Sequence, residues 1–145
     1  MLRMMSGAFS YRVESGDGGY LVQFVDVPEA HTSGKTGRRA RAAACDCLIA
    51  ALGGYLELRR AIPGPSVPRG RPAVELPALV AAKLALYQAM RDQRVTRVAL
   101  ASKLGVTEGA VRKLLDLDHQ SHIRLVEAAL EALGQKLVVE VRRAA

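Results

Sequence analysis

The stretch RVALASKLGVTEGAVRKLLD, residues 97–116, carries the strongest structural signal in the chain. Its apolar spacing predicts two short helices, residues 97–104 and 107–116, joined by a sharp turn. Ala101 supplies the small side chain needed where two helices cross closely, and Gly105 accepts the left-handed backbone of the turn. The residues expected to lock the second helix in place are apolar: Leu100, Leu104, Val106, Val111 and Leu114. The pattern is typical of a helix-turn-helix that binds double-stranded DNA.

The second helix of such a motif enters the major groove with its N-terminal side facing the base edges. Arg112 is expected to read a guanine through two hydrogen bonds, and Lys113 to bind a phosphate. Thr107 begins this helix, where a hydroxyl and free backbone N–H groups both favour phosphate. The predicted DNA-contacting residues are Arg97, Thr107, Glu108, Gly109, Arg112, Lys113 and Asp116. The alternative interpretation is a plain four-helix bundle with a solvated basic face.

Helical patterns continue on both sides of the motif, which predicts an all-α DNA-binding domain over residues 78–145. The apolar face of the preceding helix consists of Val80, Leu84 and Tyr87. Ser121 is expected to cap a following helix and Gly134 to end it. Residues 136–142 alternate as a terminal strand does, and its open edge could pair with a symmetry mate. Because one motif makes few DNA contacts, we expect a homodimer or a higher homo-oligomer.

The N-terminal part predicts a small ββ(β)αβ unit, so the fold class of the chain is α+β. Residues 10–14 and 20–25 alternate with period two, and Gly-rich residues 15–19 join them as a β-hairpin. Thr36 can cap a helix over residues 37–55 that carries one apolar stripe. Two shorter segments are possible further strands: residues 31–33 and 73–76.

A connector at residues 61–72 separates the two parts. It contains four prolines and two glycines in twelve residues, which can sustain neither a helix nor a central strand. We therefore predict two domains, residues 1–77 and residues 78–145.

The net charge is +7 and the isoelectric point about 9.9, which suits a polyanionic partner. Residues 1–66 carry eight Lys and Arg against six Asp and Glu, or +2, and residues 67–145 carry thirteen against eight, or +5. The excess thus lies mainly in the predicted DNA-binding domain. An anionic membrane surface is the alternative partner, but no helix has a strong basic face and no apolar run approaches the roughly 20 residues of a membrane span. We expect a cytoplasmic protein without a membrane partner.

Catalytic and metal-binding patterns are not found in the sequence. Cys45 and Cys47 would point about 200° apart on a helix, which suits neither chelation nor a disulfide. His31 stands alone, and His119 and His122 border the expected helix cap. The carboxylates of the N-terminal part are not spaced to share a metal, which argues against a nuclease. We predict no enzyme activity, no metal site and no cofactor.

The order of elements along both parts resembles the HicB family of antitoxins. The N-terminal features that carry this resemblance are the hairpin, the segment YLVQFVDVP (residues 20–28), TSGKT (residues 32–36), the Ala-rich helix and IPGPS (residues 62–66). In the C-terminal part, VRKLLD (residues 111–116) and the residues up to 139 resemble the subgroup with a fused Xre/Cro-type helix-turn-helix domain.

The resemblance implies a type II toxin–antitoxin system. It implies an N-terminal domain like a degraded ribonuclease H fold, which masks a small HicA-type mRNA-cleaving toxin, and a C-terminal domain that represses the operon. The toxin-binding residues that it suggests are Tyr20, Val22, Phe24, Asp26, Pro28 and His31. The helix start at residues 35–41 is basic here, whereas related antitoxins usually carry acidic residues, and this weakens attraction to a basic toxin.

The alternative to an antitoxin is a free-standing transcription regulator, whose N-terminal domain senses a ligand or only mediates oligomerisation. A neighbouring open reading frame for a very small basic protein with one central histidine would favour the antitoxin.

Overall fold

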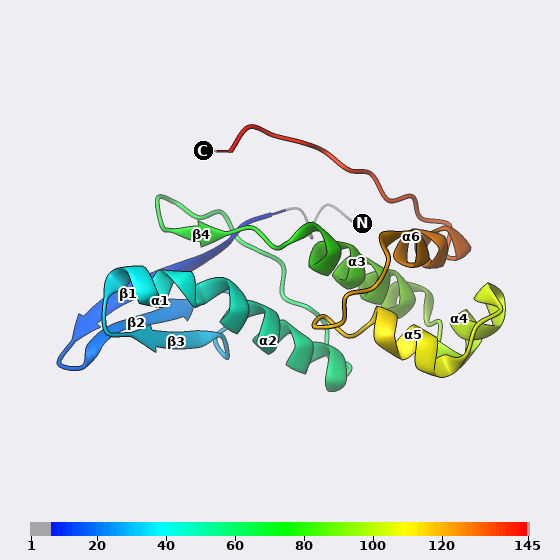
Figure 1. Cartoon of the computed structure of the whole chain (residues 1–145), viewed down its shortest axis with the longest axis horizontal. Helices are drawn as coiled ribbons and strands as arrows, with labels where there is room; N and C mark the ends of the chain where they lie inside the picture. Colours follow the sequence, from blue (N-terminus) through cyan, green and yellow to red (C-terminus); the bar gives the residue numbers. More distant parts are fainter. Residues whose placement is uncertain (1–6, 145) are drawn as a thin grey trace.

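The computed structural model describes residues 7–144, so residues 1–6 and 145 of the predicted domains lie outside it. Its strands are β1 (Phe9–Gly16), β2 (Gly19–Phe24), β3 (His31–Gly34) and β4 (Ala73–Val74). Its helices are α1 (Gly37–Ala42), α2 (Ala44–Glu57), α3 (Ala78–Gln93), α4 (Arg97–Leu104), α5 (Glu108–Leu114) and α6 (Ile123–Ala132). The sheet has the order β3-β2-β1-β4, and all neighbours are antiparallel. An N-terminal sheet with helices is thus followed by a helical region, which confirms the α+β prediction (Figure 1).

The N-terminal part forms the elements that its local sequence predicts, with one exception. β1 and β2 make the predicted hairpin, which closes with Gly16 opposite Gly19. The hydroxyl oxygen of Thr36 accepts a hydrogen bond from the N–H of Arg39 at 3.2 Å, so the predicted cap is confirmed. The single helix expected over residues 37–55 is instead divided at Ala43 into α1 and α2.

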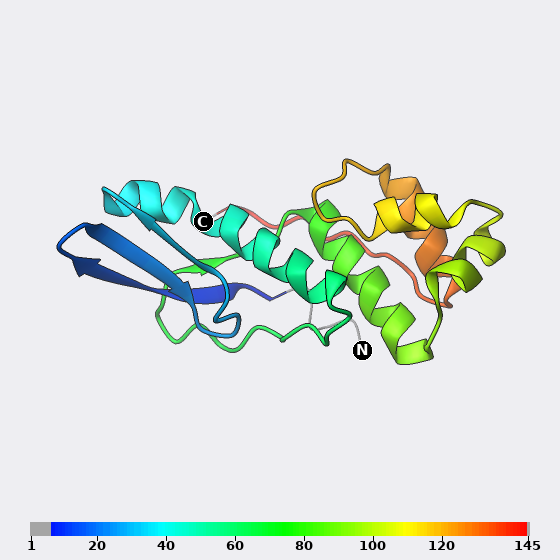
Figure 2. The same cartoon turned by 90° about the horizontal axis from the view of Figure 1, so that it is seen from below.

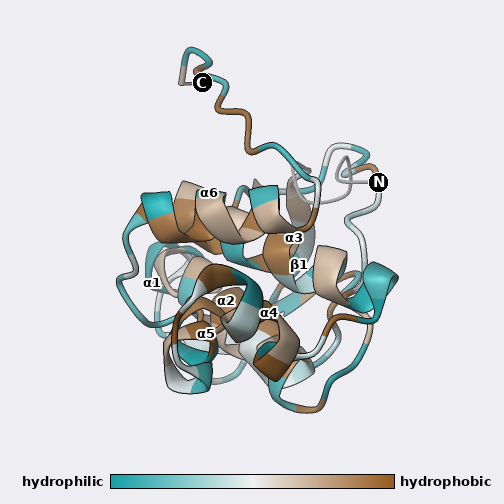
Figure 3. Cartoon of the chain, turned by 90° about the vertical axis from the view of Figure 1, so that its right-hand side faces the viewer, coloured by the Kyte–Doolittle hydropathy of each residue, from teal (hydrophilic) through white to brown (hydrophobic). Residues whose placement is uncertain are grey.

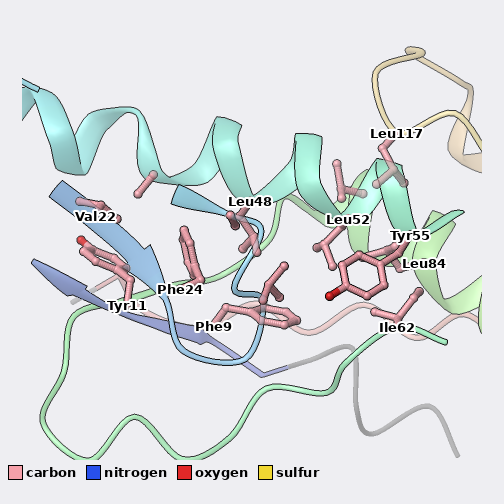
Figure 4. Packing of buried hydrophobic residues seen from close by; sticks show 14 of the residues in the cluster. Phe9, Tyr11, Val22, Phe24, Leu48, Leu52, Tyr55, Ile62, Leu84 and Leu117 are labelled. Carbon is pink, nitrogen blue, oxygen red and sulfur yellow. The ribbon is translucent and has the colours of Figure 1, made fainter. Parts of the chain in front are cut away.

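The first hydrophobic core lies between the sheet and the helices α1 and α2 (Figures 1 and 4). Val22 and Phe24 of β2 point into it from the sheet, and Leu48 and Leu52 of α2 point into it from the helix (Figure 4). The rings of Tyr11 and Phe24, opposite each other in the register, have centroids 5.4 Å apart. Because strand side chains alternate, the residues in between occupy the other face of the sheet, which no helix of residues 7–144 covers.

The helix α3 contributes to two cores. Val80 and Leu84 pack in the core of the sheet, whereas Leu86 and Met90 pack in a second core with α4, α5 and α6. The remaining large residues of the second core are Leu100, Val111, Leu114, Val126, Leu130 and Leu133. A helix that is apolar on nearly all sides is buried on nearly all sides, and α3 is the shared support of both parts.

The connector runs without regular structure from residue 60 to residue 68 and then turns into β4. Its Ile62 is buried in the first core, and both the backbone N–H and the hydroxyl of Ser66 donate to the carboxylate of Asp26 at 2.8 Å. These contacts hold the connector against the N-terminal part.

Two predictions for the C-terminal part are wrong. The terminal strand over residues 136–142 is not formed, because no strand among residues 7–144 lies beside it to supply hydrogen bonds. Leu137 packs against the second core, but Val138, Val139 and Val141 are exposed, and the chain after Leu137 leads away from the helices (Figure 3). Ser121 does not cap the last helix: α6 begins after His122, which makes no side-chain cap.

Among residues 7–144, no helix is long and apolar enough to cross a membrane.

Candidate DNA-binding surface

The predicted turn between the two short helices forms at Gly105. This residue ends α4 in the left-handed region, with φ 66° and ψ 33°. The N–H of Val106 donates to the carbonyl oxygen of Ala101 at 3.0 Å, which closes the end of α4. A Cβ added at Gly105 would meet nothing within 4 Å, so the backbone conformation alone favours glycine there. The chain then changes direction, and α5 does not extend α4 (Figure 1).

Capping and packing fix where α5 lies. The hydroxyl oxygens of Thr96 and Thr107 each accept from the N–H three residues later, at 3.1 Å, so each threonine caps its helix. The predicted lock is formed by three buried residues: Leu100, Val111 and Leu114. Leu104 is partly buried against them. Val106 was expected to share in this packing but is 38% exposed, because the turn carries it to the surface.

The outer face of α5 is exposed. Gly109, Arg112 and Lys113 are spaced at i, i+3 and i+4, so they share one side of the helix, and all three are exposed. Asp116 is exposed as well, but it lies beyond the end of α5 at Leu114, because the helix is shorter than the predicted span to residue 116. Thr107 is exposed at the helix start. The surface that the sequence predicts for DNA is therefore open to solvent.

Glu108 links the two predicted arginines. One carboxylate oxygen lies 2.6 Å from an η nitrogen of Arg112, and the other lies 3.6 Å from Nε of Arg97. This places a cation from α4 and one from α5 side by side at the start of α5.

Lys83 stabilises the C-terminal end of α5 and the loop after it, a role that the sequence did not predict. Its side chain extends from α3, is fully buried, and donates from Nζ to the carbonyl oxygens of Lys113, Asp116 and His119 at 3.1, 2.6 and 2.7 Å. Burial lowers the pKa of Lys83, while the charges of Asp116 and Asp118 act in the opposite direction. A cation at the C-terminal end of a helix also interacts favourably with the helix dipole.

The loop after α5 is held by side chains of its own. The carboxylate of Asp116 accepts from the N–H of Asp118 at 3.0 Å, so this predicted DNA contact also stabilises the turn. Ser121 lies 3.0 Å from Nδ1 of His119 and donates to the carbonyl oxygen of Lys113 at 3.4 Å. His119 and Ser121 thus connect the loop to the end of α5.

The residues suggested for toxin binding are divided between surface and core. Tyr20 is 38% exposed, and Pro28 and His31 are exposed. Val22 and Phe24 are 0% and 2% exposed, because the alternation of β2 turns them under the helices, and a partner cannot reach them without opening the core.

Asp26 is half-buried, and its carboxylate is occupied by the two hydrogen bonds from Ser66. It therefore has a structural role that the sequence analysis did not identify.

A second polar cluster lies between the loop before β3 and the end of α2. The hydroxyl of Tyr55 donates to the carboxylate of Glu29 at 2.6 Å, and Arg60 lies 3.5 Å from its other oxygen. The hydrogen bond from Tyr55 is the main cause that lowers the pKa of Glu29. The guanidinium of Arg60 also lies over the Tyr55 ring, 4.5 Å from its centroid. None of these residues stood out in the sequence, because they are far apart along the chain.

The described part of the chain shows no group of three or more His, Cys, Asp or Glu arranged to hold a metal ion. Cys45 and Cys47 are free thiols, and burial raises the pKa of both, so neither has the depressed pKa of a reactive thiol.

Comparison with known proteins gives two consistent results. A family model described as a HicB-like antitoxin of bacterial toxin–antitoxin systems matches residues 8–85. Antitoxin HicB 2 of Photorhabdus laumondii is 38% identical, over 89% of this chain and 92% of the relative. Antitoxin HicB of Escherichia coli K12 is 38% identical over 83% and 88%, and antitoxin HicB of Pseudomonas fluorescens is 35% identical over 94% of both. The relatives therefore match the sheet and most of the helical region together.

Proposed function

The chain belongs to the HicB family of antitoxins, which are not enzymes, and from this premise we propose that it has two activities. Its N-terminal part, which resembles a degraded ribonuclease H fold, masks a small HicA-type mRNA-cleaving toxin. Its helix-turn-helix binds operator DNA and represses its own operon. Both activities would take place in the cytoplasm, where the operator and the mRNA are.

The observation that carries the DNA-binding proposal is the exposed cationic face of α5 behind the turn at Gly105. Arg112 is 64% exposed at its side chain, which leaves it able to turn from Glu108 toward a base. Lys113 is exposed beside it. A guanine presents two acceptors in the major groove, which suit the two-pronged guanidinium, whereas a lysine suits a phosphate.

Fluorescence anisotropy with a duplex from the DNA upstream of the gene tests this proposal. Arg112→Ala should weaken binding by about 1–3 kcal/mol and relax the preference for one base pair. Lys113→Ala should weaken binding to every sequence and reduce the salt dependence by one phosphate. Arg124→Ala, on the exposed side of α6, is the control that should leave both unchanged. Equal affinity of the wild type for upstream and unrelated duplexes would contradict operator recognition.

The toxin-binding proposal is supported by the extent of the family match, because residues 8–85 include the whole sheet and both helices that cover it. We assign the contact to the exposed members of the suggested set, Tyr20, Pro28 and His31, and leave out the buried Val22 and Phe24. Co-expression with the product of the neighbouring gene, pull-down and a growth-rescue assay test it. Tyr20→Ala together with His31→Ala should reduce capture and rescue, whereas Lys103→Ala on α4 should not.

We propose that the protein is a dimer or a larger homo-oligomer, in which the segment over residues 136–142 pairs with its copy. Exposed Val138, Val139 and Val141 at its end support this, because an unpaired apolar segment gains free energy from a strand partner. Light scattering should give at least twice the monomer mass of 15.6 kDa, and Val139→Lys should lower it. A monomer at micromolar concentration would contradict the proposal.

A further inference from the structure

A cleft of about 940 Å³ lies between the second half of α2 and the helix-turn-helix. Its walls come from α2, the end of α3, the start of α4 and the residues after α5. Figure 2 shows the end of α2 beside α3 at this place. Two hydrogen bonds to α3 hold the chain after α2: the hydroxyl of Tyr87 donates to the carbonyl oxygen of Arg60 at 2.6 Å, and Arg91 donates to that of Arg59. The two sides of the cleft are therefore fixed to each other.

The charge of the cleft is positive. Five arginines line it against three carboxylates, which leaves +2: Arg59, Arg91, Arg94, Arg97 and Arg112. Among residues 7–144, Arg97 and Arg112 pair with Glu108, but neither Arg59 nor Arg94 has a salt-bridge partner. Both of these unpaired arginines are exposed. The cleft thus offers free guanidinium groups next to the predicted reading helix.

The backbone at these two arginines is unusual. Arg59 and Arg94 both follow the end of a helix in the left-handed region, each at φ 54°. Glycine is the ordinary residue at such a position, because any side chain there is strained. The chain has arginine at both positions on the rim of the cleft, so each side chain carries a conformational cost that packing does not explain.

The floor of the cleft on the α2 side is open. Gly53 lies at the centre of this face, since the lining residues Ile49, Ala50, Leu56 and Glu57 stand at i−4, i−3, i+3 and i+4 from it. A Cβ added at Gly53 would meet nothing within 4 Å. Because of this open space, no packing requirement within residues 7–144 accounts for a glycine at this position. Glycine also destabilises a helix interior relative to alanine. The open space allows a ligand to approach the α2 backbone closely.

We propose that this cleft binds the DNA backbone beside the operator bases, so that the N-terminal part of the chain adds phosphate contacts to those of the helix-turn-helix. The proposal rests on the proposed DNA-binding function and extends it to α2 and the residue after it. Arg97 and Arg112 belong both to the cleft and to the predicted DNA surface, which makes the two surfaces continuous. The occupant is a polyanion, because the unpaired groups are guanidinium ions spread along the rim and hydrogen-bond to phosphate in pairs.

The test measures anisotropy of the full chain with a duplex from upstream of its gene, over a series of salt concentrations. The double variant Arg59→Gly with Arg94→Gly removes both charges and relieves both strained backbones. We expect its slope of log affinity against log salt to be less steep by about 1.8, or about 0.9 for each phosphate contact. Its affinity should fall roughly tenfold without a change in base preference. Its melting temperature should stay equal or rise, which a purely structural role would not produce.

Arg69→Gly is the matched control. Arg69 also has a positive φ, 52°, and is exposed, but it lies in the turn before β4 and not in the cleft. This variant removes one arginine charge and one strained backbone, half of what the double variant removes, and its salt dependence should equal that of the wild type.

A second pair of variants changes the floor of the cleft. Gly53→Lys and Gly53→Glu should both stabilise α2, because both residues favour helix more than glycine does. DNA affinity should rise in Gly53→Lys and fall in Gly53→Glu.

Unchanged salt dependence in the arginine double variant, or an equal change in Arg69→Gly, overturns the cleft proposal while the wild type still binds DNA. A wild type that binds neither the upstream nor an unrelated duplex overturns the proposed function and the cleft together.

Discussion

Replacing the buried Lys83 by methionine tests the support of the predicted reading helix. Methionine has a similar length and an apolar body, but it cannot donate to the three carbonyl oxygens that Nζ contacts at 2.6–3.1 Å. Each carbonyl oxygen then loses its ammonium donor and keeps a backbone N–H, that of Asp116, His119 or Ser121. At about 1 kcal/mol for each lost hydrogen bond, Lys83→Met should reduce the free energy of unfolding by about 3 kcal/mol.

Urea unfolding followed by circular dichroism measures this loss directly. At about 2–4 °C for each kcal/mol in a chain of this size, the melting temperature should fall by about 10 °C. Lys103→Met is the control, because Lys103 is an exposed lysine on α4 and its replacement should change stability by less than about 0.5 kcal/mol.

DNA binding provides the second measurement. Because Lys83 holds the carbonyl end of α5, the variant should also bind the upstream duplex more weakly at a temperature where it is fully folded. A stability loss below about 1 kcal/mol would show that the cost of burying the charge equals what its hydrogen bonds contribute, and would refute the reasoning.

Three further predictions follow from single contacts. Gly105→Ala should cost about 1 kcal/mol of stability by thermal unfolding, from the left-handed backbone alone, since the added Cβ meets nothing within 4 Å. Tyr55→Phe should cost about 1 kcal/mol at pH 7. Because Tyr55 lowers the pKa of Glu29, this difference should be present above the ordinary pKa of 4.5 and should disappear as the pH falls through the lowered value, by urea unfolding at pH 7 and pH 3. Asp26→Ala should increase proteolysis of the connector around Ser66, whose two hydrogen bonds it removes.

The helix-turn-helix could be predicted because its signals are local. Ala101 and Gly105 each act within a few residues of their own position, and the structure contains both as expected. The terminal strand was predicted from alternation in the same way, but a strand also needs a partner, and alternation does not supply one. Local patterns therefore predicted the short helices and their turn, whose hydrogen bonds form within one segment. They failed for the terminal strand, which needs hydrogen bonds from a second segment.

The assignment of β2 residues shows the same limit on a smaller scale. The hairpin was correct, yet the residues suggested for toxin contact, Tyr20, Val22 and Phe24, all have the same parity along the strand. Two of them point into the core. The uncovered face carries the intervening residues, such as Leu21, which is 43% exposed. A shift by one residue exchanges the two faces of a strand. Which set of alternate side chains is exposed therefore depends on the helices that cover the other face, and these helices come later in the chain.

The interactions between distant segments left weaker traces in the sequence, but Lys83 left one. It is the one charged residue among residues 78–90, a stretch otherwise made of apolar residues and Gln88. A helix of that composition has no broad polar face, so a lysine at its centre has little access to water and must find acceptors within the protein. Helix ends supply such acceptors, because their last carbonyl oxygens lack partners in the helix. The buried lysine of α3 finds these acceptors at the end of the short helix α5 and in the loop after it, and this fastens α5 to α3, the helix that both cores share.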